Sequence, residues 1–390
     1  MVDYSRFARI GLSEDEQSDS EEEHEARTPL QGPQALTPAG VAASLPTSDA
    51  EVAVPQQCCA FCYTALTAAA AKRCGKCHKR VFCSRECQLQ DWKCGHKHWC
   101  GVAGEIDHDF EIREASGKGL GIFAKRAFER CEVVMMERPA LRLPDLGRLS
   151  GAQPPASVVD AAMALMPHGK DMKAKFNLNA MGCGEHAESG LFVRMSYLNH
   201  ACLPNALHHF VEAHGVKIIS TSKKIEAGEE ITISYISFEA DALLSRLFGA
   251  DRSKLMLTKW GFACSCPACV DSFWAEKLKR MRELDEAILQ CGQNLQFDRG
   301  IRCAKALLKL YDEAGEHPAT YARTYYDLFQ LSIARKATLG QAHTYIKLAL
   351  QNRKLLVGTA TGADEMVKEY ERLIKTPSSH MGYLIGERRW

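Results

Sequence analysis

The stretch that decides the fold is Asn199-His200-Ala201-Cys202-Leu203-Pro204-Asn205, near the middle of the chain. Two further stretches follow it, Gly228-Glu229-Glu230-Ile231-Thr232-Ile233-Ser234-Tyr235 and then Gly261-Phe262-Ala263-Cys264-Ser265-Cys266-Pro267-Ala268-Cys269. The second stretch has the β-branched residues of a short strand, which would end at a tyrosine. The third has the close cysteine spacing of a metal site. Each stretch alone is a weak signal, but their order directs the interpretation of the whole chain.

Length and composition describe an ordinary globular protein with an acidic beginning. The 390 residues suffice for two or three domains. The sequence lacks a run of about 18 apolar residues and an apolar signal region at its start, so neither a transmembrane helix nor a secretory signal is expected. Residues 1–57 carry 11 acidic and 3 basic residues, and their composition predicts disorder. The basic excess lies in residues 58–100 and either suits acidic partners or is simply solvated.

The central part of the chain has a β pattern with an interruption. Residues 109–144 predict strands and turns, and residues 191–235 return to the same pattern after an insert at about 145–185. The segment 207–220 predicts a hairpin with His214-Gly215 as its turn.

The C-terminal part has a helical pattern. From Phe273 onward apolar residues recur at helical spacing, and the last predicted helix covers 363–375. Paired helices of this kind are similar to tetratricopeptide hairpins, although the repeat signature is imperfect. Strands followed by helices place the chain in the α+β class.

The cysteines predict metal sites. Seventeen cysteines without a secretory signal indicate ligands rather than disulfides. Four pairs lie in residues 58–100, namely Cys59 and Cys62, Cys74 and Cys77, Cys83 and Cys87, and His96 and Cys100. Eight such ligands fit two tetrahedral zinc sites, and a helix could place Cys83 and Cys87 on one face. A segment this short buries little core, so zinc would contribute folding energy of order 10–16 kcal/mol per site.

This spacing resembles the MYND finger. The resemblance implies interleaved zinc sites, one formed by Cys59, Cys62, Cys83 and Cys87 and the other by Cys74, Cys77, His96 and Cys100. It also implies contacts with proteins, often through proline-rich peptides. Both sites would be closed to catalysis.

The three stretches quoted first resemble the heart of a SET domain, the fold of S-adenosylmethionine-dependent lysine methyltransferases. With the finger and the helical tail, the chain resembles the SET- and MYND-domain (SMYD) family, most clearly over residues 58–270. The resemblance implies small β-sheets with knot-like threading near Asn199 and Tyr235. It divides the chain into 1–57, the finger at 58–100, a SET domain at 109–240, a post-SET zinc segment at 241–270 and a helical region at 271–390.

The resemblance also assigns roles to single residues. Tyr235 would be catalytic, beside the transferred methyl group. Tyr197 and Trp260 would be walls of the lysine channel. Cys202 would complete a third zinc site with Cys264, Cys266 and Cys269. The cofactor would be contacted by Lys118, Gly119, Leu120, Gly121, Asn179, Asn199, His200, Tyr235 and Phe262, where the glycines permit close backbone approach.

The sequence departs from the family pattern in four features. One is the order of the domains, and three are residues that bear on the shape of the lysine channel. The finger precedes the SET domain instead of interrupting it, Ala201 replaces the serine of the family motif, and Trp260 stands where a tyrosine is frequent. Asn179 keeps the amide of an upstream element whose aromatic residue is replaced by Met181. The last three bear on the substrate and on the degree of methylation, which the sequence leaves open.

The expected function is S-adenosylmethionine-dependent methylation of a protein lysine, on a histone tail or a non-histone protein. An alternative is an inactive adaptor that recruits partners through the finger and the helices. A third hypothesis is a nucleic-acid binder that uses the basic finger, whose affinity would fall steeply with salt. This third hypothesis is the least favoured of the three, no membrane partner is expected, and nucleus and cytoplasm are both compatible with the sequence.

Overall fold

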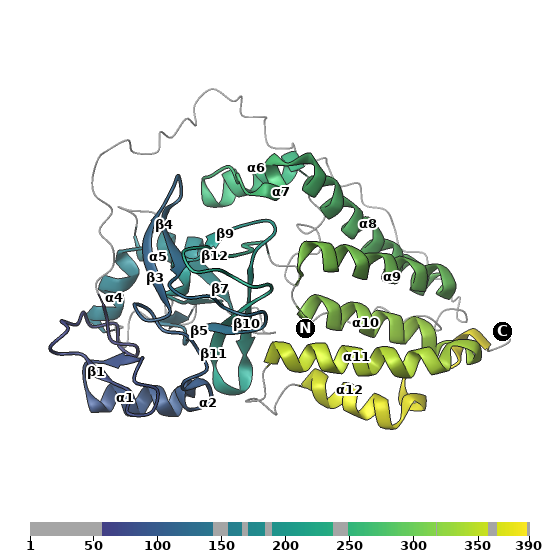
Figure 1. Ribbon diagram of the computed structural model, residues 1–390, viewed down its shortest axis with the longest axis horizontal. Helices are drawn as coiled ribbons and strands as arrows, with labels where there is room; N and C mark the ends of the chain where they lie inside the picture. The colour runs from purple at the N-terminus through teal and green to yellow at the C-terminus, as the bar shows by residue number, and fades with distance from the viewer. Residues whose placement is uncertain are drawn as a thin grey trace, which may run out of the picture.

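The computed structural model describes residues 57–142, 155–165, 171–183, 189–236, 249–316, 318–357 and 365–387. The acidic segment predicted to be disordered lies outside these residues except for Gln57. Figure 1 shows a β-rich half that includes the finger, and a half built of stacked helices. None of the described helices has the length and apolarity needed to cross a membrane.

The finger, residues 58–100, is a short hairpin followed by a helical segment. Its elements are β1 (Lys72–Arg73), β2 (Val81–Phe82), α1 (Arg85–Asp91), the π-helical turn η2 (Trp92–His96) and α2 (Lys97–Trp99). Ser84 caps α1, because its hydroxyl accepts the Cys87 N–H at 3.1 Å. Serine is a preferred N-cap, so the helix begins after it. The prediction that Cys83 and Cys87 share a helical face is therefore wrong, since Cys83 precedes the helix.

The β-domain, residues 109–236, contains three small sheets among its described residues. They have the orders β3-β4-β12-β9, β10-β11-β5 and β6-β8-β7. The strands are β3 (Phe110–Ala115), β4 (Gly119–Ala124), β5 (Val133–Glu137), β6 (Leu141–Arg142), β7 (Ala180–Gly182), β8 (Ser189–Leu191), β9 (Asn199–His200), β10 (Ala206–Val211), β11 (Val216–Thr221) and β12 (Glu230–Ile233). The predicted hairpin is confirmed as β10 and β11, and Gly215 supplies the left-handed φ of 61° at its turn.

A short parallel pairing joins two of the three deciding stretches. In β9 and β12, Asn199 lies opposite Thr232 and His200 lies opposite Ile233. The Ala201 N–H extends the pairing by donating to the Ile233 carbonyl at 3.0 Å. Ile231 and Ile233 of β12 join one buried core, which also includes Phe110, Ile122, Phe128, Val134, Leu198 and Ile219.

Two helices of the insert cover the third sheet. They are α4 (Ala156–Met163) and α5 (Met172–Asn179). Val158 and Phe176 from these helices and Leu191 from β8 belong to a second buried cluster, which also includes Tyr63 of the finger. The insert therefore packs against both the β-domain and the finger.

The helical domain, residues 249–387, confirms the predicted helical tail. Its helices are α6 (Gly249–Trp260), α7 (Pro267–Val270), α8 (Ser272–Gln293), α9 (Phe297–Ala314), α10 (Pro318–Ile333), α11 (Leu339–Val357) and α12 (Glu365–Lys375). The sequence analysis did not predict α6, which precedes the cysteine cluster. The stacked helices α8 to α12 enclose two buried clusters, whose members include Leu284, Leu307, Leu328, Phe329, Ile346 and Tyr370.

Candidate active site and metal centres

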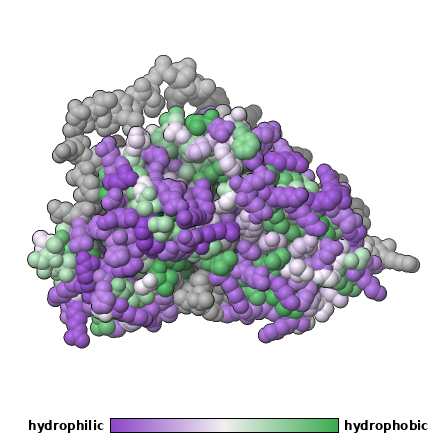
Figure 2. Space-filling model, viewed as in Figure 1, coloured by the Kyte–Doolittle hydropathy of each residue, from purple (hydrophilic) through white to green (hydrophobic). Residues whose placement is uncertain are grey.

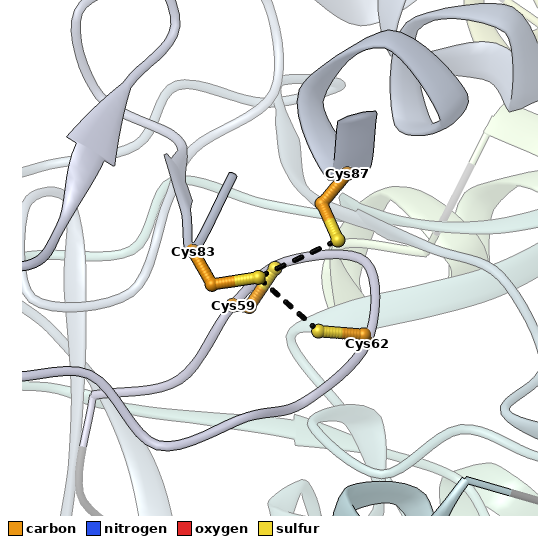
Figure 3. Close-up of side chains that lie close together, drawn as sticks. All are labelled: Cys59, Cys62, Cys83 and Cys87. Atoms are coloured by element: carbon orange, nitrogen blue, oxygen red, sulfur yellow. Dashed lines mark hydrogen bonds between the residues drawn. The ribbon is translucent and has the colours of Figure 1, made fainter. Parts of the chain in front are cut away.

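The first metal centre is formed by the cysteines expected from the finger resemblance. Cys59, Cys62, Cys83 and Cys87 place their sulfur atoms within 4.8 Å of one another (Figure 3). The Cys83 sulfur lies 3.5 Å from the sulfurs of both Cys62 and Cys87. A tetrahedral zinc ion with Zn–S bonds of about 2.3 Å separates its sulfur ligands by about 3.8 Å. The donor set therefore fits zinc.

The second centre combines three cysteines with a histidine. The sulfurs of Cys74 and Cys100 lie 3.8 Å apart, and His96 Nε2 lies 3.6 Å from the Cys77 sulfur. Burial, and after it the charge of Arg80, lowers the pKa of His96 to about 4. The imidazole is therefore neutral near pH 7, which is the form that binds zinc.

The third centre joins the β-domain to the segment after it. The Cys202 sulfur lies 3.4 Å from that of Cys269 and 4.0 Å from that of Cys264, and the Cys202 N–H donates to the Cys266 sulfur at 3.3 Å. Contacts with Cys202 and Cys264 lower the pKa of Cys266 well below its usual range, which favours the thiolate. All-cysteine coordination is typical of a structural zinc site.

Tyr235 lies where β12 ends and is bonded through both its backbone and its side chain. Its hydroxyl donates to the Leu198 carbonyl at 2.7 Å, and its N–H donates to His200 Nδ1 at 3.0 Å. Burial, with the Glu230 charge second, raises the pKa of Tyr235 above its usual range. The phenol is therefore neutral at physiological pH and has oxygen lone pairs for a second hydrogen bond.

Aromatic side chains from three parts of the chain surround this tyrosine. The ring centre of Tyr235 lies 5.4 Å from that of His200, 5.5 Å from Trp260 and 6.3 Å from Phe262. Trp260 ends α6, and Phe262 lies between that helix and the cysteine cluster. The structure thus brings the predicted channel residue Trp260 and the predicted cofactor residue Phe262 beside the predicted catalytic tyrosine.

His200 connects the third metal centre to Tyr235. Its Nδ1 accepts the Tyr235 N–H, and its Nε2 lies 3.3 Å from the Cys202 sulfur. Because Nδ1 is an acceptor, the proton of a neutral imidazole is assigned to Nε2, which donates toward the thiolate. Hydrogen bonds to metal ligands of this kind orient the ligands. A metal at Cys202 would therefore stabilise the position of the tyrosine backbone.

The glycine turn of the cofactor motif packs against Asn199. A Cβ atom on Gly121 would lie 2.9 Å from both Asn199 Nδ2 and Glu230 Oε1, so only glycine fits without displacement. Asn199 Nδ2 donates to the Leu120 carbonyl at 3.1 Å and to Glu230 Oε1 at 2.7 Å. Lys118 Nζ reaches Glu230 Oε2 at 2.7 Å. Four of the predicted cofactor residues therefore lie together, and Gly119 between them has a left-handed φ of 78°.

Sequence reasoning missed the role of Glu230 as the carboxylate that links Asn199 and Lys118. The sequence does show two adjacent acids, Glu229 and Glu230, at the start of the strand. It does not show which of the two carboxylates contacts Asn199 and Lys118. The neighbouring Glu229 instead accepts the Asn205 amide at 3.1 Å.

Two other predicted residues, Asn179 and Tyr197, make contacts outside this set. The Asn179 amide donates to the Lys175 carbonyl at 2.8 Å, at the end of α5. Tyr197 packs between the main β-domain core and the insert cluster. Burial raises the pKa of Tyr197 to about 12, with smaller contributions from Cys58 and Glu137. The roles of Asn179 in cofactor binding and of Tyr197 in the channel stay predictions.

Two known protein families match this chain, one over most of the β-domain and one over the finger. The SET domain family matches residues 119–236, and the MYND finger family matches residues 59–100. The chain therefore contains a SET domain and a MYND finger. Its SET domain contains Gly121, Asn199 and Tyr235, and its MYND finger contains the first two metal centres.

Three curated relatives illustrate the similarity. A SET and MYND domain-containing protein of Dictyostelium discoideum is 34% identical over 90 residues, which are 23% of this chain and 24% of the relative. The protein-lysine N-trimethyltransferase SMYD5 of Gallus gallus is 37% identical over 82 residues, 21% of this chain and 19% of the relative. The N-lysine methyltransferase SMYD2 of Gallus gallus is 23% identical over 231 residues, 55% of this chain and 51% of the relative. The matches therefore cover from about a fifth to about half of these relatives.

Proposed function

We propose that this SET- and MYND-domain protein is an S-adenosylmethionine-dependent protein-lysine N-methyltransferase. The observation that carries the proposal is the placement of Tyr235. Its neutral hydroxyl is fixed at the Leu198 carbonyl, and its ring lies beside Trp260 and Phe262. The glycine turn and Asn199 meet at Glu230, on the strand that ends just before Tyr235.

The residues support methyl transfer by orienting an amine and excluding water from it. S-adenosylmethionine, when bound, would supply an electrophilic methyl group, whose transfer to the amine would break the methyl carbon–sulfur bond and release S-adenosylhomocysteine. A lysine amine must be neutral to attack, yet its pKa in water is about 10.4. A narrow apolar channel lined by Trp260 and Phe262, beside the positive charge of the sulfonium, would disfavour the charged ammonium by desolvation and charge repulsion, and the amine proton would pass to solvent. The Tyr235 oxygen can then accept a hydrogen bond from the neutral amine and align its lone pair with the methyl carbon.

We also propose the remaining partners and cofactors. Zinc ions would occupy the three cysteine-rich centres, two in the finger and one beside the active site. The substrate would be a protein lysine, on a histone tail or another protein in the nucleus or cytoplasm. The finger would bind a proline-rich peptide of a partner protein. Sequence similarity to lysine methyltransferases supports the lysine substrate, and the three cysteine-rich donor sets support zinc.

The test begins with calorimetric titration of the purified, zinc-replete protein with S-adenosylmethionine. Protein that binds is then incubated with labelled S-adenosylmethionine, mixed histones and cell lysate. The proposal predicts binding and a labelled protein band, and mass spectrometry should place the label on a lysine. A folded, zinc-replete protein that does not bind the cofactor would contradict the proposal and favour an adaptor.

A further inference from the structure

A buried carboxylate joins the finger to the SET domain. Glu137 ends β5 and is only 1% exposed. Its Oε1 accepts the Tyr63 hydroxyl at 2.8 Å and the Arg194 N–H at 3.0 Å, and its Oε2 accepts the Met195 N–H at 3.0 Å. A buried carboxylate is costly unless such donors satisfy it, so its removal would release three groups at once. We call Tyr63, Glu137, Arg194 and Met195 the Glu137 junction.

The junction brings together the first metal centre and a turn of the SET domain. Tyr63 follows the ligand Cys62 directly and has a left-handed φ of 63°. From the opposite side, Arg194 donates through Nη2 to the Cys59 carbonyl at 3.1 Å. The guanidinium carbon of Arg194 also lies 5.6 Å from the Tyr63 ring centre. The loop between two metal ligands is therefore fixed to the Arg194 backbone and side chain.

A short path leads from the junction to the Tyr235 hydroxyl. Met195 begins the 3-10 turn η3 (Met195–Tyr197), and the Leu198 N–H closes it by donating to the Met195 carbonyl at 3.0 Å. The carbonyl of Leu198 then accepts the Tyr235 hydroxyl at 2.7 Å. Because Met195 and Leu198 are fully buried, the turn cannot move freely. A change in the junction would therefore shift the acceptor that orients Tyr235.

We propose that Glu137 and Tyr63 are positioning residues for methyl transfer, acting through the Leu198 carbonyl on Tyr235. The inference rests on the proposed function. It makes the MYND finger a structural part of the active site, in addition to any partner that the finger binds. A displacement of the hydroxyl affects alignment of the amine, so it should lower kcat and leave cofactor binding unchanged.

The first test uses Tyr63→Phe, which removes one hydroxyl. We expect kcat to fall about 10-fold, while the Kd for S-adenosylmethionine stays within about two-fold. The matched control is Tyr321→Phe in the helical domain, which removes a similarly buried hydroxyl that donates to Asp312 at 2.8 Å. A second control, Ser157→Ala, removes a 2.6 Å bond to the Cys62 carbonyl without touching Glu137. Both controls should keep the wild-type kcat.

The second test does not depend on activity. Hydrogen exchange measured by mass spectrometry should be faster over residues 194–199 in Tyr63→Phe and unchanged there in Tyr321→Phe. Wild-type kcat in Tyr63→Phe, or an equal loss in Ser157→Ala, would overturn the positioning role. If the wild-type protein transfers no methyl group, the proposed function fails. In that case the inference is still tested, because hydrogen exchange over residues 194–199 that is unchanged in Tyr63→Phe would overturn the link from the Glu137 junction to Leu198.

Discussion

At the scale of single residues, the chemistry depends on a phenol that stays neutral. Burial and the nearby Glu230 charge raise the pKa of Tyr235, and its hydroxyl already donates to Leu198. An ionised Tyr235 could not make that donation and would lose its fixed position. The protonated phenol is therefore the form that can orient a substrate amine.

This pKa shift predicts how the rate depends on pH. The target lysine must be neutral, so kcat/KM should rise between about pH 7 and pH 9.5. Tyr235 should not oppose this rise, because its raised pKa keeps it protonated throughout. A pH–rate profile measured with labelled cofactor checks the expectation, and circular dichroism controls for unfolding. An alkaline decline with an apparent pKa near 9 in a folded protein would contradict it.

A second residue-scale prediction concerns Gly121. The substitution Gly121→Ala places a Cβ atom 2.9 Å from Asn199 Nδ2 and Glu230 Oε1. The displaced Asn199 should weaken S-adenosylmethionine binding by about 10-fold or more, equivalent to about 1.4 kcal/mol. Calorimetry measures the Kd. The control is Gly182→Ala, where a Cβ atom would meet nothing within 4 Å, and it should bind as the wild type does.

At the scale of elements, the third metal centre fixes the segment after the SET domain. Cys202 follows β9, whereas Cys264, Cys266 and Cys269 follow α6. Zinc bound to all four would tie Trp260 and Phe262 to the strand that carries His200. A structural metal would thus have consequences for the catalytic site.

The element-scale prediction is that Cys266→Ser loses one zinc ion and weakens cofactor binding. With its ligand set incomplete, the segment 260–262 should separate from Tyr235 and raise the Kd for S-adenosylmethionine at least about five-fold. Elemental analysis and calorimetry measure the two effects. Cys303→Ser, which alters a cysteine of α9 outside the three centres, is the control. Full zinc content together with an unchanged Kd would refute this role for the centre.

The elements also show what the sequence could predict. The cysteine spacing predicted the ligand pairs, and the family resemblance predicted their grouping into three sets and the residues around Tyr235, which the structure brings together. No motif or short spacing in the sequence marks Glu137 as a residue of the site. Its three donors come from two segments far apart in the sequence, Tyr63 and the adjacent pair Arg194 and Met195, which meet only when the finger packs on the SET domain. Helix α6 was not predicted, since the resemblance assigned residues 241–270 to a post-SET zinc segment.

At the scale of the whole molecule, charged side chains join the three domains. Arg80 of the finger is 2% exposed, pairs with Asp91 at 2.8 Å and with Glu105 at 3.0 Å, and donates to the carbonyl of Met136 in β5 at 3.4 Å. On the other side, Arg130 donates to the Ser222 carbonyl and to the Glu316 carbonyl, both at 3.0 Å. The SET domain is therefore linked to the finger by a buried network and to the helical domain by a more exposed contact.

The contacts of Arg130 between the SET domain and the helical domain predict the effect of Arg130→Ala. Loss of its bonds to Ser222 and Glu316, and of its contact with the Tyr321 ring, should loosen the helical domain from the SET domain. We expect a loss of about 1–2 kcal/mol of stability and a larger radius of gyration in small-angle scattering. The control is Lys224→Ala, which removes an exposed ion pair with Glu226. Scattering identical to the wild type would contradict a joining role for Arg130.

The central claim is that Tyr235 orients a lysine amine for methyl transfer. The most direct measurement compares single-turnover transfer of labelled methyl by wild-type protein and by Tyr235→Phe, with cofactor affinity measured on both. We predict that the variant binds S-adenosylmethionine within about two-fold of wild type and transfers methyl about 100-fold more slowly. Equal transfer rates in two folded proteins that bind the cofactor equally would contradict the claim.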